Sequence, residues 1–259
     1  MLIIAERINA SRKTIAHAIS TGDRTFIQGE AKAQTLAGAH YIDVNAGTFV
    51  GEEADKLKWI VEAVQEVTDL PLSIDSPDHA VIRAMMPLLK KAPMINSITL
   101  EPSRIEGILP LVTEYRTKVI ALCQAEHEMA ETAEGKVSLA GRLVEKLTAA
   151  GVPIDNIYID PLVYPLSTNP NSARATLEAI GGIMKAFPGV HTVCGLTNVS
   201  YGLPARTTGQ SGVSRGGDHH GVGFGDHRSD GQTSLCNAEG RNTSRRQGRL
   251  LHGLHLRLP

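Results

Sequence analysis

Three observations predict an α/β protein folded as a TIM (β/α)8 barrel. In the first 206 residues, short β-like runs alternate with longer amphipathic runs seven times in succession. The β-like runs are mostly apolar and the connections are short, which favours a parallel sheet with right-handed crossovers. Seven such units account for most of the eight that a barrel requires. A doubly wound open sheet is the alternative, but ERINASR (6–12) lacks the glycine-rich phosphate turn that usually follows its first strand.

Each element has a local signal. The expected strands cover residues 2–7, 41–47, 71–76, 93–99, 118–124, 156–163 and 190–198. The expected helices cover residues 24–37, 52–68, 78–91, 101–116, 136–150 and 172–187. The helix over 52–68 is the clearest, because five apolar residues share one face: Leu57, Ile60, Val61, Val64 and Val67. Gly38 and Gly151 mark the ends of two helices, and Pro87 should shorten or bend another.

Composition narrows the class of protein. A chain of 259 residues that is 42% hydrophobic can bury one large core. A net charge of −1 gives no reason to expect nucleic acid or an anionic membrane as partner. No apolar run has the length of a membrane span, and MLIIAERIN lacks signal-peptide features, so we expect a cytoplasmic protein. Cys123, Cys194 and Cys236 are isolated in sequence, which indicates reduced thiols.

The character of the sequence changes after Arg206. In residues 207–259, only eleven of 53 residues are hydrophobic and eleven are glycine, too little apolar material to offset the entropy of ordering the chain. We therefore expect residues 1–206 to form the barrel domain and 207–259 to be an aberrant tail, disordered or out of frame. The tail's His219-His220 pair and its arginines could instead bind a metal or RNA, an interpretation that rests on composition alone.

Polar residues gather where the expected strands end. These ends read Glu6-Arg7-Ile8-Asn9, Asp43-Val44-Asn45, Asp75-Ser76, Asn96-Ser97, Asp160-Pro161 and Thr197-Asn198. Ligands bind at this end of a barrel, although Asp, Asn and Ser there can also cap the following helix. Carboxylates and amides suit the amidine-like edge of a heterocycle, and the scarcity of basic residues argues against a phosphate. No histidine lies at these ends, so we expect no catalytic metal.

Six of these segments carry a resemblance: ERIN, DVNAG, the IDS around Asp75, MINSI, YIDPL and GLTNVSYGLPAR. In this order and spacing they resemble the pterin-binding methyltransferases, barrel enzymes that move the N5-methyl group of methyltetrahydrofolate to a corrinoid protein. The resemblance extends from Met1 to about Arg206. It implies tetrahydrofolate or its methyl derivative as substrate, cobalamin carried by a partner protein, and a homodimer.

The resemblance also implies roles for individual residues. Asp75, Asn96 and Asp160 would hold the pterin's aminopyrimidine edge, and Asn198 would be the catalytic residue whose amide reaches N5. Gly195 and Ser200 fall on the loop that admits substrate, and Arg206 would lie near the outer part of the folate. Behind these contacts, we expect supporting positions for which structural roles are as plausible as direct contact: Glu6, Asn9, Asp43 and Asn45.

The reaction sets one chemical requirement. A tertiary amine releases a methyl group to Co(I) only when positive charge on its nitrogen is favoured, so a donor near N5 must act most strongly in the transition state. No covalent enzyme intermediate is needed, and Cys194 is expected to pack within its strand. Two alternatives stay open: a catalytically inactive pterin-binding remnant and a dihydropteroate synthase. The second fits less well, because its substrate has a pyrophosphate leaving group that needs basic residues on the late strands. This chain has Cys194, Thr197 and Asn198 on its seventh strand instead.

A change of reading frame would account for the tail. GDHRSDG (225–231) can be encoded so that a one-base shift reads ATIDPT, close to the IDPTD-like end expected of an eighth strand. RLLHGLHLRLP (249–259) can be encoded so that the same shift reads DYCMDYIYAF, an ending typical of the family. We therefore expect the eighth strand and last helices to be missing or scrambled, with open edges on the first and seventh strands.

Sequencing of the encoding DNA tests the frame hypothesis. A one-base change near codon 206 should restore an open frame that encodes both segments. If no such change restores them, the tail is the protein's own sequence and the hypothesis is wrong.

Overall fold

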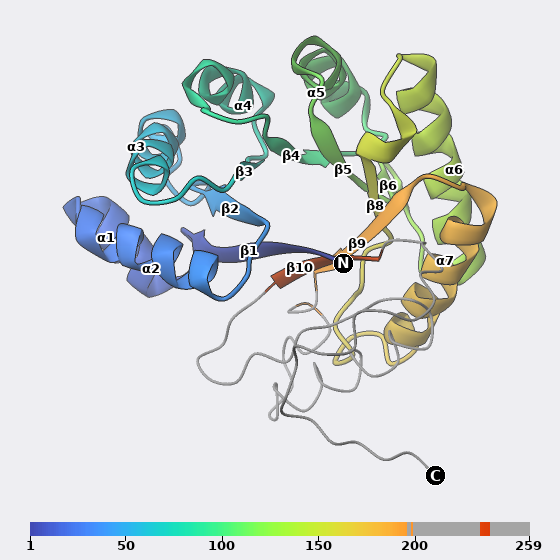
Figure 1. The fold of residues 1–259 in the computed structure, drawn as a ribbon. Coiled ribbons are helices and arrows are strands. Elements are labelled where there is room, and N and C mark those ends of the chain that lie inside the picture. The colour runs from blue at the N-terminus through green and yellow to red at the C-terminus, as the bar shows by residue number, and fades with distance from the viewer. Residues whose placement is uncertain (196–197, 199–233, 239–259) are drawn as a thin grey trace, which may run out of the picture.

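The computed structural model describes residues 1–195, 198 and 234–238, and these residues form a closed barrel with helices outside the parallel strands (Figure 1). Seven strands run parallel in chain order: β1 (Leu2–Asn9), β2 (Tyr41–Asn45), β3 (Leu72–Asp75), β4 (Met94–Ile98), β5 (Lys118–Leu122), β8 (Ile157–Asp160) and β9 (His191–Gly195). The seven predicted parallel strands and the barrel class are therefore confirmed.

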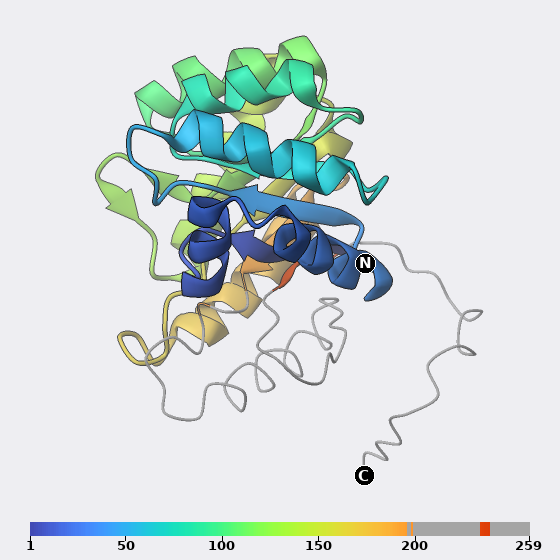
Figure 2. The same cartoon turned by 90° about the vertical axis from the view of Figure 1, so that its left-hand side faces the viewer.

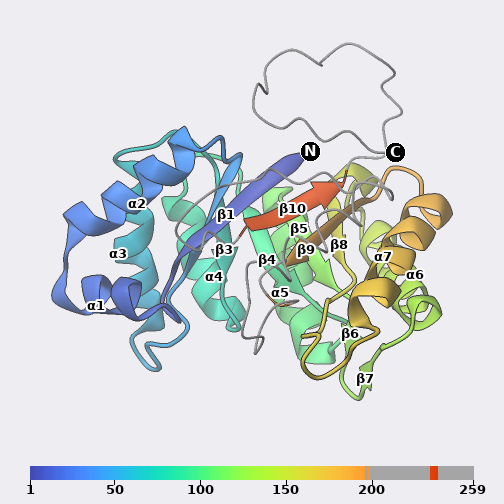
Figure 3. The ribbon, with the colours of Figure 1, turned by 90° about the horizontal axis from the view of Figure 1, so that it is seen from below.

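The eighth position of the barrel is filled by a strand of opposite direction. β10 (Ser234–Ala238) pairs antiparallel with both β1 and β9, and Figure 3 shows it lying between them. The expectation of open edges on β1 and β9 is therefore wrong. Backbone N–H and C=O groups can pair with a short strand of any composition, so a tail poor in apolar residues can still cover both edges. The rest of the tail lies outside the described residues.

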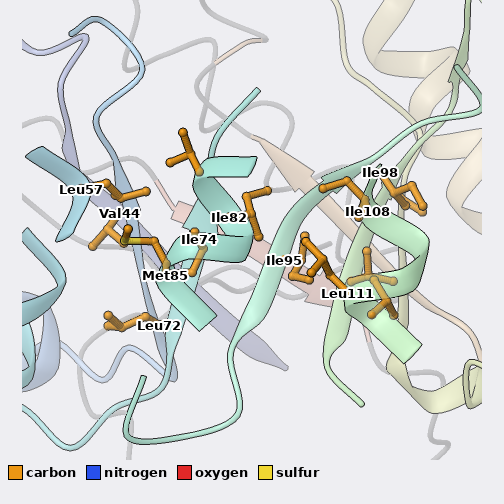
Figure 4. Packing of buried hydrophobic residues seen from close by; sticks show 14 of the residues in the cluster. Val44, Leu57, Leu72, Ile74, Ile82, Met85, Ile95, Ile98, Ile108 and Leu111 are labelled. Atoms are coloured by element: carbon orange, nitrogen blue, oxygen red, sulfur yellow. The ribbon is translucent and has the colours of Figure 1, made fainter. Parts of the chain in front are cut away.

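The helices form a layer outside the strands, visible from the side in Figure 2. They are α1 (Lys13–Thr21), α2 (Arg24–Leu36), α3 (Glu53–Gln65), α4 (His79–Met85), α5 (Pro102–Tyr115), α6 (Ala133–Ala149) and α7 (Ser172–Ala186). Between the helices and the sheet lies the main hydrophobic core, in which Val44 and Ile74 of the strands pack with Leu57 and Ile82 of the helices (Figure 4). Among the described helices, none has the length and apolarity required to cross a bilayer.

Pro87 acts as the sequence predicts. α4 ends at Met85, and the chain continues as a 3-10 turn, η1 (Met86–Leu88), because a proline nitrogen cannot donate to the helix ladder. A second 3-10 turn, η2 (Ile154–Asn156), precedes β8.

Two features were missed by the sequence analysis. α1 is a nine-residue helix that ends at Gly22, whose φ of 70° glycine adopts without steric cost. A small hairpin of β6 (Gln124–Ala125) and β7 (Glu128–Met129) follows β5, so β5 ends two residues before the predicted limit. Strands of two residues leave no periodic pattern in a sequence.

A second, smaller apolar cluster lies inside the barrel. It consists of one residue from each of six parallel strands: Ile4, Tyr41, Met94, Ile120, Tyr158 and Val193. No helix contributes to this cluster, which distinguishes it from the core between sheet and helices. We call these six residues the barrel floor.

Removing apolar volume from the barrel floor should destabilise the protein. Ile120 is 1% exposed, so Ile120→Ala should lower the free energy of unfolding by about 2–5 kcal/mol. Urea denaturation measures the effect, and Val50→Ala is the control because Val50 is 93% exposed. A loss of less than about 0.5 kcal/mol for Ile120→Ala, as at a surface site, would contradict the packed floor.

Candidate active site

The candidate site lies directly above the barrel floor. Side chains two positions apart on a strand point to the same face. The residues two positions beyond the floor toward the carboxyl ends of the strands are therefore also directed into the barrel: Glu6, Asp43, Asn96, Leu122, Asp160 and Gly195. Asp75 of β3 lies between Asn45 of β2 and Asn96 of β4 in the strand register. Five of the predicted site residues are therefore directed into the barrel, and Asp75 lies beside one of them, Asn96.

Asp43 connects three neighbouring strands. Its Oδ2 accepts hydrogen bonds from Ser73 Oγ at 2.6 Å and from Asn96 Nδ2 at 3.0 Å. Asp43 is 1% exposed and Ser73 is fully buried. These two bonds compensate part of the cost of burying a carboxylate, and they fix the orientation of the Asn96 amide.

Asp75 has its own amide partner. Asn45 Nδ2 donates to Asp75 Oδ2 at 3.0 Å and to the Asp75 carbonyl oxygen at 3.2 Å, while Asn45 Oδ1 accepts from the Gly47 N–H at 3.0 Å. Asn45 is therefore oriented at both ends of its amide. The structure thus places two hydrogen-bonded groups side by side on β2, β3 and β4, Asp43 with Asn96 and Asp75 with Asn45, and together we call them the polar network.

Asp160 is oriented by the turn that follows β8. Its Oδ1 accepts from the Leu162 N–H at 2.8 Å, and its backbone oxygen accepts from the Cys123 N–H at 2.9 Å. The carbonyl oxygens of Pro161 and Leu162 each accept from Lys136 Nζ at 2.6 Å. Lys136 belongs to α6 and is fully buried, so a cation lies behind this edge of the site.

A second cation supports the opposite side. Arg104, in the first turn of α5, donates to the backbone oxygens of Ser97, within β4, and of Pro77, which follows β3. Its charge opposes, in small part, the rise in pKa that burial imposes on the Asp75 carboxyl. Arg104 therefore holds the loops around Asp75 and Asn96 through their backbone.

Burial dominates the ionisation of the acids. Desolvation raises the pKa of Asp43 to about 6 and that of Asp160 to about 6. For Asp75, burial and then the nearby charge of Asp43 raise the pKa to about 8. Burial also raises the pKa of Glu6 well above its ordinary value, with further contributions from Asp43, Asp75 and Asp160. Four carboxyl groups thus face one poorly solvated space, as at many ligand-binding sites.

Comparison with known families decides the assignment. The pterin binding enzyme family matches residues 5–222, most of the chain. The chain belongs to the pterin-binding enzyme family. The family match extends sixteen residues beyond Arg206, where the sequence analysis placed the end of the resemblance.

Two relatives of known activity are similar in sequence. Methylcorrinoid:tetrahydrofolate methyltransferase of Eubacterium limosum is 38% identical over 208 residues, which cover 80% of this chain and 77% of that protein. Methionine synthase of Mycobacterium tuberculosis is 33% identical over 214 residues, which cover 78% of this chain but 18% of that much longer protein.

Solved structures of similar fold are dihydropteroate synthases. The enzyme from Thermus thermophilus has a TM-score of 0.62 at 20% identity, with 85% of this chain and 84% of that chain covered. The Xanthomonas albilineans enzyme in complex with 7,8-dihydropteroate has a TM-score of 0.59 at 18% identity, with 84% and 83% covered. At these identities the likeness establishes the shared barrel fold of this pterin-binding enzyme.

Helix capping does not account for the central strand-end residues. Among the described helices, the residues before the first turns are Arg12, Asp23, Glu52, Asp78, Glu101, Thr132 and Asn171. Asp43, Asp75, Asn96 and Asp160 are therefore not helix caps. Asn9 differs, because its Oδ1 accepts from the Ser11 N–H at 2.9 Å and stabilises the turn before α1.

The remaining predicted residues lie near or beyond the end of β9. Gly195 is the last residue of β9 and is buried, whereas Asn198 is exposed. Ser200 and Arg206 lie outside the described residues. The roles predicted for these four residues stay predictions.

Three residues of this candidate site were missed by the sequence analysis. Ser73 follows the same two-residue alternation as Asp75, and this pattern could have indicated it. Lys136 replaces an apolar residue on the buried face of α6, which continues with Leu139, Leu143 and Leu147. Arg104 gives no such signal, because its partners are backbone oxygens, which every residue carries whatever its side chain.

The raised pKa values predict how stability changes with pH. A carboxyl group with a higher pKa in the folded state binds its proton more tightly there, so stability decreases as pH rises from the unfolded pKa through the folded one. Asp43 and Asp160 should lower the free energy of unfolding as pH rises from about 4 to 6, and Asp75 should continue to lower it up to about pH 8. Asp75→Asn should therefore flatten the decrease in unfolding free energy between pH 6 and 8.

Urea denaturation at pH 6, 7 and 8 measures this slope. Asp69→Asn is the matched control, because Asp69 is an exposed aspartate remote from the site network. A wild-type slope that persists unchanged in Asp75→Asn would show that the Asp75 carboxyl does not hold a proton at neutral pH.

Proposed function

We propose that this chain transfers the N5-methyl group between methyltetrahydrofolate and the cobalt of a corrinoid carried by a partner protein. The polar network of Asp43, Asp75, Asn96 and Asn45 above the barrel floor is the observation that carries the proposal. The 38% identity to methylcorrinoid:tetrahydrofolate methyltransferase supports the same reaction, and the name of that enzyme includes both substrates.

The site offers the groups that a pterin ring requires. The aminopyrimidine edge presents adjacent N–H donors and a ring acceptor, which a carboxylate and an amide can satisfy together. Asp75, Asn96 and Asp160 supply these groups, and the apolar barrel floor lies below them for the flat ring. Asp43 fixes the orientation of Asn96, and Asn45 fixes the orientation of Asp75.

Transfer from the folate requires one donor close to N5. In that direction the bond between methyl and N5 breaks and its electron pair stays on N5, which binds one proton taken from solvent. Co(I) supplies the electron pair of the new bond between cobalt and methyl. Asn198 lies three residues beyond Gly195, the last residue of β9. Its amide can donate to N5 as charge develops and afterwards accept from N5–H, so it stabilises the transition state more than the ground state.

The chemistry of the late strands favours methyl transfer over dihydropteroate synthesis. A pyrophosphate leaving group needs free cationic side chains. The buried ammonium group of Lys136 is instead bonded to the backbone oxygens of Pro161 and Leu162. Cys194, near the end of β9, is a buried free cysteine, as a packing residue would be.

The partner and the assembly follow from the same proposal. A corrinoid protein must bring its cobalt to the mouth of the barrel, while folate binds within it. The homodimer and the cytoplasmic location expected from the sequence stay predictions. Size-exclusion chromatography with light scattering measures the molar mass in solution and so tests the homodimer.

Asn198→Ala should separate binding from catalysis. We expect methyltetrahydrofolate binding, measured by isothermal titration, to weaken only a few-fold, because the pterin edge is held by other residues. Methyl transfer to free cob(I)alamin should fall by about 10²- to 10³-fold, as when one transition-state donor is lost. Asn171→Ala is the control, because Asn171 is exposed at the start of α7.

The wild-type chain gives the decisive comparison. If it does not bind methyltetrahydrofolate, the proposed function is wrong. Binding without any transfer would instead favour the inactive pterin-binding remnant. Unchanged transfer in Asn198→Ala would remove Asn198 from the mechanism but leave the pterin site intact.

A further inference from the structure

Lys136 occupies an unusual place for a lysine. It is fully buried, and it lies on the face of α6 that otherwise presents leucines to the core. Its Nζ donates to the carbonyl oxygens of Pro161 and Leu162, both at 2.6 Å, and lies 4.6 Å from the centre of the Tyr164 ring. All three of these partners belong to the segment that follows β8. Figure 3 shows α6 beside this part of the barrel.

A buried ammonium group at this position is costly. Desolvation of a cation opposes burial, and the first turn of a helix carries partial positive charge that repels it. Among the described residues, no carboxylate lies within ion-pair distance of Lys136 Nζ. A leucine at position 136 would extend the apolar face of α6 and avoid the cost of burying a charge. The lysine therefore requires an explanation beyond packing.

The contacts of Lys136 lead to Asp160 through one residue. Leu162 accepts from Lys136 through its carbonyl oxygen and donates its N–H to Asp160 Oδ1 at 2.8 Å. Leu162 has a φ of 57°, a left-handed conformation that a residue with a side chain rarely adopts unless its surroundings enforce it. The two bonds from Lys136 hold the turn in this conformation. The turn, through the Leu162 N–H, then holds one oxygen of the Asp160 carboxyl.

We propose that Lys136 is a positioning residue for folate binding: it fixes the turn at 161–162 so that Asp160 presents its carboxylate to the pterin ring. This inference rests on the proposed function, because it assigns Asp160 to the pterin. Lys136 itself is buried behind the turn and acts through it.

Electrostatics supports the same role. Burial raises the pKa of Asp160 to about 6, whereas the Leu162 N–H and the Lys136 charge lower it. The other titratable groups that face Asp160 are Glu6 of β1, Cys123 after β5 and Tyr164 after β8. They bring no positive charge. Removing Lys136 should therefore raise the pKa of Asp160 toward neutrality and leave fewer molecules with an ionised carboxylate.

Two neutral substitutions test the proposal in the full chain. In Lys136→Met, methyltetrahydrofolate binding at pH 7 should weaken about tenfold, the value of one charge-assisted hydrogen bond. The acidic limb of the affinity's pH dependence should move to higher pH. Lys136→Gln retains a donor for one of the two carbonyl oxygens but loses the charge, so the acidic limb should move in the same direction. Lys146→Met is the matched control, because Lys146 is exposed near the end of the same helix.

A double substitution tests whether Lys136 acts through Asp160. In an Asp160→Asn background, Lys136→Met should add little further loss of affinity, because no carboxylate remains to be positioned or ionised. Additive losses would contradict the proposed connection.

The outcomes separate this proposal from the proposed function. No binding by the wild-type chain would overturn the proposed function. Wild-type binding with unaltered affinity and pH dependence in both Lys136 variants would overturn the positioning role alone. Weaker binding with an unmoved acidic limb would also overturn it, as would loss of cooperative thermal unfolding in both variants, because Lys136 would then serve the fold only.

Discussion

The two-residue alternation of parallel strands in a closed barrel is the constraint on which this site depends. It directs Ile4, Tyr41 and Tyr158 inward and therefore also directs Glu6, Asp43 and Asp160 inward one level higher. Carboxyl groups placed there lose most of their water, so their pKa values rise together. The apolar floor and the acidic network above it thus have one geometric cause. A ring with a polar edge and apolar faces matches this pair of layers.

Amides and backbone N–H groups hydrogen-bond to Asp43, Asp75 and Asp160, and among the described residues no ion pair joins one of these three carboxyl groups to a cation. Asn45 and Asn96 bond to carboxylates, whereas Lys136 and Arg104 bond to carbonyl oxygens of the neighbouring loops. An ion pair would satisfy a carboxylate permanently. Cations that bind the backbone instead leave the carboxylate oxygens able to accept hydrogen bonds from a ligand. Their positive charge still stabilises the ionised form of the nearby carboxyl groups.

The fold is shared more widely than the chemistry. Dihydropteroate synthases at 18–20% identity have the same barrel, and the family that includes this chain is defined by pterin binding and not by one reaction. Differences in reaction must then come from groups beyond the pterin edge, since fold alone does not specify function. In this chain we propose that those groups lie near and after the end of β9, where Cys194 and Asn198 stand. The antiparallel β10 shows further that a strand of reversed direction can close the barrel.

The sequence by itself determined the seven parallel units, the break in α4 at Pro87 and the polar strand ends, because periodicity and local backbone preferences are encoded within a few neighbouring residues. Tertiary structure decided which of those polar residues meet. The bond between Asn96 and Asp43 joins residues 53 positions apart, and Lys136 reaches Asp160 through a turn 26 positions away. The pairing of β10 with β1 was likewise invisible in composition. Such contacts depend on strand register and on the curvature of the closed sheet, which no local pattern contains.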